Sequence, residues 1–131
     1  VICDIDNYKS INDRFSHQAG DAVLQTIARL LLRHSRKRDL VARYGGEEFV
    51  VVLPGADALS ARVVAESLRH RVESLALPHE GNPATGVVTI SLGVATCAPV
   101  RGREPTALVE AADKQLYRAK EGGRNRVEAA G

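Results

Sequence analysis

The chain has 131 residues, of which 44% are hydrophobic and 26% are charged, and its formal net charge is +2. This length and composition predict one globular domain with a sizeable core, and they are too small for two. The near-neutral charge, and five Phe and Tyr residues without any Trp, argue against a nucleic-acid-binding surface.

The first six residues have the pattern of a strand that ends in acids. Val1-Ile2-Cys3 looks like the second half of a buried strand, so we expect the domain to be truncated within its first strand. Alternation places the carboxylates of Asp4 and Asp6 on one face, with Ile5 on the other. Two acids at the carboxyl end of a strand suggest a functional site.

The polar segment 7–15 precedes a long helix. Its Ile11 and Phe15 are four residues apart, which predicts a short helix or turn that presents polar side chains nearby. An exposed first turn is the simpler interpretation of these side chains, which are Lys9, Asn12 and Asp13.

The long helix is amphipathic, because its apolar positions fall on one stripe with a 3.6-residue period: Val23, Leu24, Ile27, Leu30 and Leu31. Asp21 lies in or near the first turn, where a carboxylate would cap the helix and complement its dipole. His17 is either a surface loop residue or a ligand contact. The basic cluster 33–39 is either a solvated helix end or an anion site built from Arg36 and Asp39.

The next segment has the pattern of a hairpin with acids at its tip. Its strands are predicted at residues 40–44 and 49–53. The pair Gly45-Gly46 is expected to supply the positive φ of a tight turn, and bare backbone can approach a phosphate closely. The adjacent carboxylates of Glu47 and Glu48 would repel by roughly 4 kcal/mol at ~4 Å and an effective dielectric of 20, which a divalent metal ion would relieve. A solvated acidic turn is the alternative.

Two helices and two strands follow. Asp57 begins a helix that is expected to bury Leu59, Val63, Val64, Leu68, Val72 and Leu75. A strand is predicted at 87–95. Thr106 is expected to cap a helix that is closed by Gly122-Gly123 and carries Leu108, Ala112, Leu116 and Ala119. A last short strand begins at Arg126-Val127.

This order predicts an α+β fold, a ferredoxin-like or palm-like β-α-β-β-α-β sandwich with a mixed sheet and an extra C-terminal helix. In the common arrangement of this motif the third strand lies antiparallel beside the first. The acids of the first strand are then expected next to those of the hairpin tip. These four acids are Asp4, Asp6, Glu47 and Glu48.

Convergent carboxylates suit Mg²⁺, which usually takes one or two of them and leaves its other positions to water and substrate phosphates. The arrangement predicts phosphoryl or nucleotidyl transfer, in which Lys120 and Arg124 could hold the outgoing phosphates. A polymerase palm would use the same metal logic, but the small size and weak basic character disfavour it.

The cysteines and the hydropathy indicate a compartment. Cys3 and Cys97 have no C-x-x-C spacing, which disfavours a zinc site or a disulfide scaffold and favours a reducing environment. No apolar run reaches the ~20 residues of a membrane span, and no signal peptide is visible. We therefore expect a cytoplasmic domain, whose parent protein could still be membrane-tethered.

Six motifs occur in order along the chain at compatible spacings. They are Asp4-Ile5-Asp6, Lys9 with Ile11-Asn12-Asp13, His17 with Gly20-Asp21, Arg43-Tyr44-Gly45-Gly46-Glu47-Glu48-Phe49, Ser91-Leu92-Gly93-Val94-Ala95, and Tyr117-Arg118-Ala119-Lys120 with Gly123-Arg124-Asn125. Together they closely resemble the GGDEF-domain diguanylate cyclases, with a nucleotidyl-cyclase-type fold, over residues 1–131. A single Gly-Gly-Glu-Glu-Phe would carry little weight, but six ordered motifs are specific.

The resemblance implies condensation of two GTP into cyclic di-GMP and two pyrophosphates, by Mg-assisted attack of a 3′-hydroxyl on an α-phosphate. Each domain of a homodimer would hold one GTP, with Mg²⁺ or Mn²⁺ as cofactor. The parent protein would carry an upstream sensory or regulatory domain. The alternative is a catalytically silent domain that binds GTP or cyclic di-GMP as a receptor; silent members generally have a broken Gly-Gly-Glu-Glu-Phe, which this chain does not.

The resemblance also implies roles by position. The metal ligands would be Asp4, Glu47 and the Ile5 carbonyl, and Glu48 would assist metal binding or deprotonation of the 3′-hydroxyl, so that Glu47 and Glu48 are the catalytic acids. The guanine would be bound by Asn12 and Asp21 with His17 close by, since a carboxylate can accept from both N1 and the exocyclic amine. The phosphate contacts would be Lys9, the amides around Asn7 and Tyr8, the backbone of Gly45 and Gly46, Lys120 and Arg124.

An inhibitory product site is implied by Arg36-Lys37-Arg38-Asp39, which matches the family's Arg-x-x-Asp signature five residues before the glycine pair. Two positions depart from the family pattern. Ser16 replaces a glycine before His17. Ser67 stands where many members have a second inhibitory-site arginine, which leaves Arg69 or a partner domain to serve.

Overall fold

The computed structural model describes residues 1–98 and 104–130. The elements in chain order are β1 (Ile2–Ile5), α1 (Tyr8–Arg14), α2 (His17–Arg33), β2 (Leu40–Arg43), β3 (Glu48–Val52), α3 (Ala58–Ser74), β4 (Ile90–Val94), α4 (Pro105–Glu121) and β5 (Val127–Ala129). None of the helices in the described part of the chain has the length and apolar character that a membrane crossing needs.

The five strands form one mixed sheet in the order β2-β3-β1-β4-β5. The β1–β3, β1–β4 and β2–β3 pairs are antiparallel, whereas β4 and β5 are parallel because α4 forms the crossover between them. The predicted α+β sandwich with a mixed sheet, an extra helix and a short last strand is confirmed.

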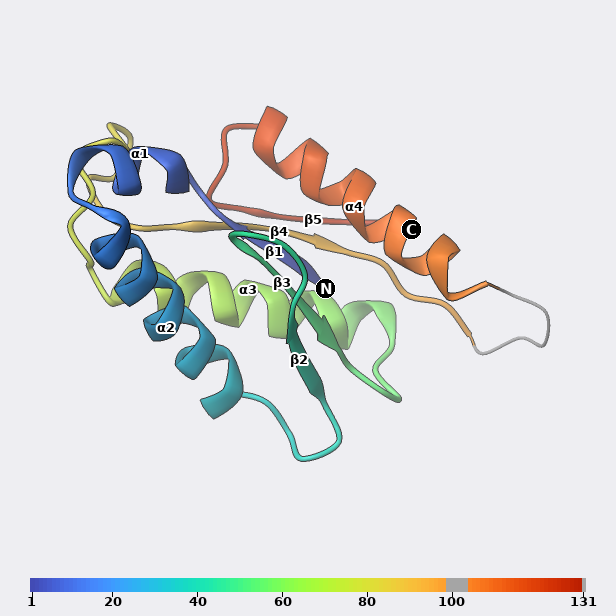
Figure 1. Ribbon diagram of the computed structural model, residues 1–131. Coiled ribbons are helices and arrows are strands. Elements are labelled where there is room, and N and C mark those ends of the chain that lie inside the picture. Colours follow the sequence, from blue (N-terminus) through green and yellow to red (C-terminus); the bar gives the residue numbers. More distant parts are fainter. Residues whose placement is uncertain (99–103, 131) are drawn as a thin grey trace.

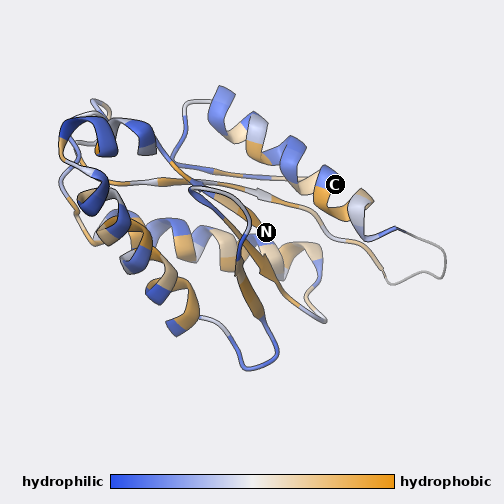
Figure 2. Ribbon diagram, in the orientation of Figure 1, coloured by the Kyte–Doolittle hydropathy of each residue, from blue (hydrophilic) through white to orange (hydrophobic). Residues whose placement is uncertain are grey.

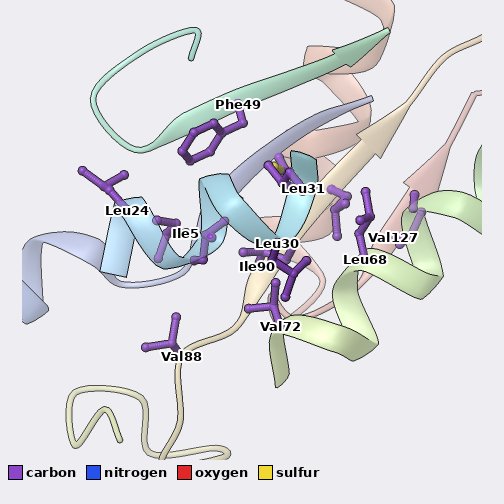
Figure 3. Close-up of a cluster of buried hydrophobic side chains, with 14 of the residues drawn as sticks. Ile5, Leu24, Leu30, Leu31, Phe49, Leu68, Val72, Val88, Ile90 and Val127 are labelled. Atoms are coloured by element: carbon purple, nitrogen blue, oxygen red, sulfur yellow. The ribbon is translucent and has the colours of Figure 1, made fainter. Parts of the chain in front are cut away.

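The sheet has a helical layer on each face: α4 lies on one side, and α2 and α3 lie on the other (Figure 1). Alternation along β1 feeds both layers. Cys3 and Ile5 belong to the main core with α2 and α3, while Ile2 packs with Ala112 and Leu116 of α4. The helices show alternating hydrophobic and hydrophilic stripes in Figure 2, and Figure 3 shows the main core between the sheet and the α2–α3 layer.

The α4 layer lies unusually close to β4 at Gly93. A Cβ on this residue would lie 2.1 Å from the carbonyl oxygen of Ala112 and 2.3 Å from the amide nitrogen of Leu116, both backbone atoms. Only glycine allows the helix to rest directly on the strand here.

The buried stripe of α3 differs from the predicted one. Leu59, Val63 and Leu75 are 72%, 60% and 41% exposed, and the buried positions are Ala61, Ala65, Leu68 and Val72. Leu68 and Val72 are buried as predicted, whereas the rest of the buried stripe runs through Ala61 and Ala65 and not through the larger apolar residues. The size of the apolar residues in the sequence thus favoured the wrong positions in part of the helix.

Of the three predicted helix caps, Asp57 is confirmed, whereas Asp21 and Thr106 are not caps. Asp57 does cap α3, because its carboxylate accepts from the amide of Ser60 at 2.7 Å. In α2 the capping residue is Ser16, whose hydroxyl accepts from the amide of Ala19. Asp21 therefore lies beyond the first turn. The predicted capping residue of the last helix, Thr106, lies inside α4, which begins at a proline that has no amide hydrogen to satisfy.

Candidate functional site

The acids of β1 and β3 meet where the two strands pair. Asp4 is the register partner of Glu48, and the Ile5 amide donates to the carbonyl of Glu47 at 3.2 Å. The predicted proximity of residues 4 and 47–48 is therefore confirmed at the level of the backbone. It arises because β3 runs antiparallel to β1 and enters the sheet beside the point where β1 ends.

Asp4 is an electrostatically unusual residue. It is 4% exposed, and its carboxylate accepts a hydrogen bond from the ammonium group of Lys120 on α4. Burial raises the pKa of Asp4 to about 6, the bond to Lys120 acts in the opposite direction, and the charges of Glu47 and Glu48 raise it further. Three carboxylates therefore lie near enough to interact electrostatically, and Lys120 is the cation that pairs with Asp4.

Asp6 does not join this group, contrary to the expectation of four convergent acids. Its carboxylate accepts from the hydroxyls of Thr89 (2.7 Å) and Ser91 (2.6 Å) and from the amide of Asn125 (3.0 Å). Asp6 follows β1 directly, and the hydrogen-bond partners of its carboxylate come from the start of β4 and from the turn before β5, not from the hairpin. Within residues 1–98 and 104–130, no three His, Cys, Asp or Glu side chains are grouped so as to hold a metal ion.

The hairpin tip is held by Arg43. Its guanidinium group donates to the carbonyls of Gly45 (3.1 Å) and Gly46 (2.6 Å). Neither glycine has a positive φ, so the expected reason for the pair is wrong. A Cβ on Gly46 would meet no atom within 4 Å. Packing within the protein therefore does not require glycine at position 46. The backbone of Gly46 is open on the side where a side chain would lie.

A second part of the site lies between α1 and α2. A Cβ on Gly20 would lie 1.9 Å from Oδ1 of Asn12 and 2.8 Å from the hydroxyl of Tyr8, so glycine allows these side chains to enter the junction. Oδ1 of Asn12 is buried and has no hydrogen-bond partner among the described residues. An unpaired buried acceptor is costly unless a ligand satisfies it.

His17 and Asp21 are exposed and lie four residues apart on α2, so one helical face presents both. Lys9 is exposed on α1. Asn7, just before α1, has a left-handed backbone with φ of 55°, and its carbonyl lies 3.2 Å from Nε2 of the fully buried His79. Nothing local in the sequence pointed to His79, which is 72 residues away.

Two of the predicted phosphate contacts, Lys120 and Arg124, lie at or just beyond the end of α4. Lys120 is in the last turn and is paired with Asp4, as described. Arg124 follows two glycines and has a left-handed backbone with φ of 64°. Its guanidinium group makes no hydrogen bond or ion pair with the described residues.

Arg36 and Asp39, the predicted product-site residues, form an ion pair with each other. Nε and Nη2 of Arg36 donate to Oδ1 of Asp39 at 3.0 and 2.7 Å, and this bond lowers the pKa of Asp39. Arg69, which was expected as one possible substitute for the missing arginine at position 67, donates to Glu66, Glu73 and Asn125.

The family model described as "Diguanylate cyclase, GGDEF domain" matches residues 1–126. The chain belongs to the GGDEF-domain family. Among curated relatives it is 42% identical to Diguanylate cyclase A of Treponema denticola over 127 residues, which cover 97% of this chain and 33% of that protein. It is also 42% identical to Diguanylate cyclase DgcP of Pseudomonas aeruginosa, over 99% of this chain and 19% of that protein. The GGDEF chain thus spans about a third or less of these curated relatives.

Solved GGDEF structures resemble this chain over nearly its full length. The GGDEF domain of DgcB from Caulobacter crescentus, determined in complex with c-di-GMP, gives a TM-score of 0.84 at 35% identity, covering 98% of this chain and 74% of that one. The active GGEEF domain of a diguanylate cyclase from Vibrio cholerae gives 0.86 at 31% identity, covering 98% and 79%. The family and the fold are therefore established together.

Proposed function

We propose that this GGDEF domain is a diguanylate cyclase that condenses two GTP into cyclic di-GMP and two pyrophosphates. The observation that carries the proposal is the pairing of Asp4 with Glu48, and of the Ile5 amide with the Glu47 carbonyl, in an intact Gly-Gly-Glu-Glu-Phe hairpin. The curated names of relatives about 40% identical over nearly the whole chain support it.

A divalent cation fits the donor set of this chain. The carboxylates of Asp4 and Glu47 and the Ile5 carbonyl would hold Mg²⁺ or Mn²⁺, because such ions prefer oxygen ligands and take one or two carboxylates. Burial of Asp4 beside two further acids is the electrostatic feature that a cation would relieve. When bound, the ion supplies charge neutralisation at the phosphates and acidifies the attacking hydroxyl.

The guanine would lie between α1 and α2. The orphaned Oδ1 of Asn12 is an acceptor for a guanine amine, and Asp21 can accept from N1 and the exocyclic amine together. Adenine offers no such pair of adjacent donors, so preference for GTP follows from these two acceptors. His17 lies on the same face of α2 as Asp21.

The phosphates would lie between the start of α1 and the end of α4. Lys9, the amides of Asn7 and Tyr8, and the bare backbone of Gly45 and Gly46 approach from one side. Lys120 and Arg124 approach from the other. Because Lys120 is bound to Asp4 here, binding of a cation and a triphosphate would transfer its ammonium group from the carboxylate to the phosphates.

Two such domains would face one another. Glu48 takes the proton of the 3′-hydroxyl on one GTP, the oxygen bonds to the α-phosphorus of the other, and the bond to the β-phosphate oxygen breaks. One pyrophosphate leaves at each of the two symmetric steps, which closes the ring. A homodimer and a cytoplasmic location, where GTP is available, follow from this chemistry. Regulation would come from another domain of the parent protein.

The decisive experiment is incubation with GTP and Mg²⁺, followed by detection of cyclic di-GMP and pyrophosphate. Glu47→Gln should abolish product, while Glu110→Gln on the exposed face of α4 serves as the matched control. Equal product from Glu47→Gln and the unmodified chain would overturn the metal assignment. Binding of GTP without product would favour the silent receptor.

The Arg36–Asp39 pair supports a product-inhibition site as part of the same proposal. Added cyclic di-GMP should slow turnover of the unmodified chain and of Lys37→Ala, but not of Arg36→Ala. Equal inhibition of all three would remove the site.

A further inference from the structure

The turn between α4 and β5 has an unfavourable backbone. Three consecutive residues have positive φ: Gly123 at 120°, Arg124 at 64° and Asn125 at 46°. Side-chain-bearing residues rarely adopt this conformation, and they keep it only where surrounding contacts hold them there. The turn therefore raises the question of what holds it.

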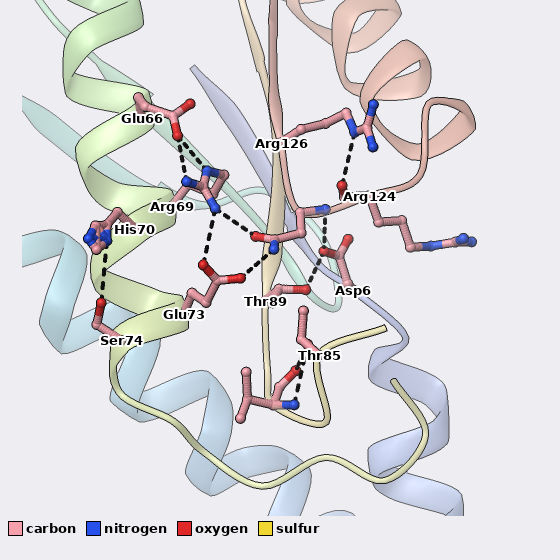
Figure 4. A network of polar contacts seen from close by, with 12 residues as sticks. Asp6, Glu66, Arg69, His70, Glu73, Ser74, Thr85, Thr89, Arg124 and Arg126 are labelled. Atoms are coloured by element: carbon pink, nitrogen blue, oxygen red, sulfur yellow. Dashed lines mark hydrogen bonds and ion pairs between the residues drawn. The ribbon is translucent and has the colours of Figure 1, made fainter. Parts of the chain in front are cut away.

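Asn125 is the residue through which the turn is held. Its amide donates to Oδ2 of Asp6 at 3.0 Å, its side-chain oxygen accepts from Nη1 of Arg69 at 3.0 Å, and its side-chain nitrogen donates to Glu73. Figure 4 shows Asp6, Arg69 and Glu73 gathered beside Arg124 of this turn. These contacts come from α3 and from the residue that follows β1, both far from the turn in sequence. They fix both the main chain and the side chain of Asn125.

Asp6 is the most buried anchor of this arrangement. It is 3% exposed, and the hydroxyls of Thr89 and Ser91 fix its carboxylate with bonds of 2.7 and 2.6 Å. The carboxylate is thus preorganised to accept the Asn125 amide. No step of the proposed reaction uses Asp6.

Arg124 immediately precedes this anchor. Its amide donates to the carbonyl of Ala119 at 2.9 Å, and its own carbonyl accepts from Nε of Arg126 at 3.0 Å. The backbone is therefore fixed on both sides, while the guanidinium group has no partner in the described part of the chain. The backbone conformation sets where the Cα–Cβ bond of this side chain starts and in which direction it leaves the turn.

We propose that Asp6 is a positioning residue, which acts through the Asn125 amide to hold Arg124 in the left-handed conformation that aims its guanidinium group at the nucleotide triphosphate. The inference rests on the proposed function and deepens it: the second acid of the Asp4-Ile5-Asp6 motif serves phosphate binding, not metal binding. Glu73 supports the same turn through the Asn125 side chain.

A double-mutant cycle separates positioning from general stabilisation. The probe is 3′-deoxy-GTP with Mg²⁺, which lacks the attacking hydroxyl and so binds without reacting; its affinity is measured by calorimetric titration. Asp6→Ala, which removes the acceptor of the Asn125 amide, and Arg124→Ala should each weaken binding about tenfold, the size expected for one charge-assisted bond. The double variant should bind within about twofold of Arg124→Ala, because Asp6 acts only through that residue. Asp113→Asn, exposed on α4, should bind as the unmodified chain does.

Amide hydrogen exchange supplies a readout that needs no nucleotide. Asp6→Ala should lose protection at the Asn125 amide, with little change in the core strands. If Asp6→Ala does not fold, Glu73→Ala takes its place in the same cycle, since this side chain is 35% exposed and accepts from the Asn125 side chain.

Three results would overturn the proposal: unchanged affinity in folded Asp6→Ala, an equal loss of affinity in the presence and absence of the Arg124 side chain, or retained protection at the Asn125 amide. Failure of the unmodified chain to bind 3′-deoxy-GTP would overturn both this proposal and the assigned substrate. Binding without turnover of GTP would overturn the proposed activity alone.

Discussion

Substitution of Gly93 by alanine tests whether α4 is held against β4 as the structure shows. The new methyl group would lie 2.1 Å from the carbonyl oxygen of Ala112 and 2.3 Å from the amide nitrogen of Leu116. Real Cβ atoms essentially never lie under 3.0 Å from another heavy atom, and ordinary van der Waals contact of a Cβ begins at 3.4 Å. Because both neighbours are helix backbone, α4 must move by about 1.3 Å, the difference between 3.4 and 2.1 Å.

Overpacking of this kind costs about 1–3 kcal/mol. For a chain of this size each kcal/mol lowers Tm by about 3–4 °C, so calorimetry should show a fall of about 3–12 °C. The shift also displaces Lys120, which α4 carries to Asp4. A misplacement of ~1 Å can cost ~100-fold in rate, and cyclic di-GMP formation should fall toward that extent.

Gly46→Ala is the matched control for the stability measurement. A Cβ there meets no atom within 4 Å, and the residue has no positive φ. Its free energy of unfolding should change by less than about 0.5 kcal/mol. A Tm of Gly93→Ala within 1 °C of the unmodified chain, or a crystal structure of it with α4 in place, would refute the packing that we describe.

Three further predictions concern the core, a helix cap and a thiol. Leu68→Ala should destabilise the fold by about 2–5 kcal/mol in denaturant titrations, whereas Leu59→Ala should stay within about 0.5 kcal/mol, because Leu68 is 3% exposed and Leu59 is 72% exposed; equal effects would contradict the observed stripe of α3. The bond to the Ser60 amide lowers the pKa of Asp57, so its stabilisation is present above the ordinary aspartate pKa and is lost as pH falls through the folded value. Asp57→Ala should therefore lower Tm at pH 7 and lose that effect in acid; a penalty independent of pH would contradict the cap. Burial raises the pKa of Cys3 to about 12, so iodoacetamide at pH 8 should modify it only after unfolding, as mass spectrometry would show; rapid modification of the native chain would contradict its burial.

Local patterns in the sequence were enough for the architecture. The buried stripe of α2 follows from apolar residues with a 3.6-residue period, which indicates a helix and not a strand. The hairpin follows from the apolar segments on both sides of Gly45-Gly46. The meeting of Asp4 with the hairpin tip followed from connectivity, since few topologies accommodate this order of elements. These features could be predicted because each depends on residues within one element or on the order of elements.

The packing roles of small residues could not be predicted from the sequence, because each role depends on the surface that lies against the residue. Ala61 and Ala65 carry the buried face of α3, and Gly20 and Gly93 admit Asn12 and α4, respectively. A sequence shows the size of each residue but not the distance between the surfaces that it separates. The hairpin tip was also predicted wrongly: Gly45 and Gly46 were expected to have positive φ angles, and neither does.

The amino-acid sequence was enough for the family and the α+β sandwich, and it predicted the acids at positions 4, 6, 47 and 48 as candidate site residues. Only the tertiary structure decided how those acids are used: Asp4 faces Lys120, whereas Asp6, two residues later on the same face, binds Thr89, Ser91 and the turn at Asn125. The physical reason is that alternation fixes the face on which a strand side chain lies, while its hydrogen-bond partners come from strands and turns 83 to 119 residues away.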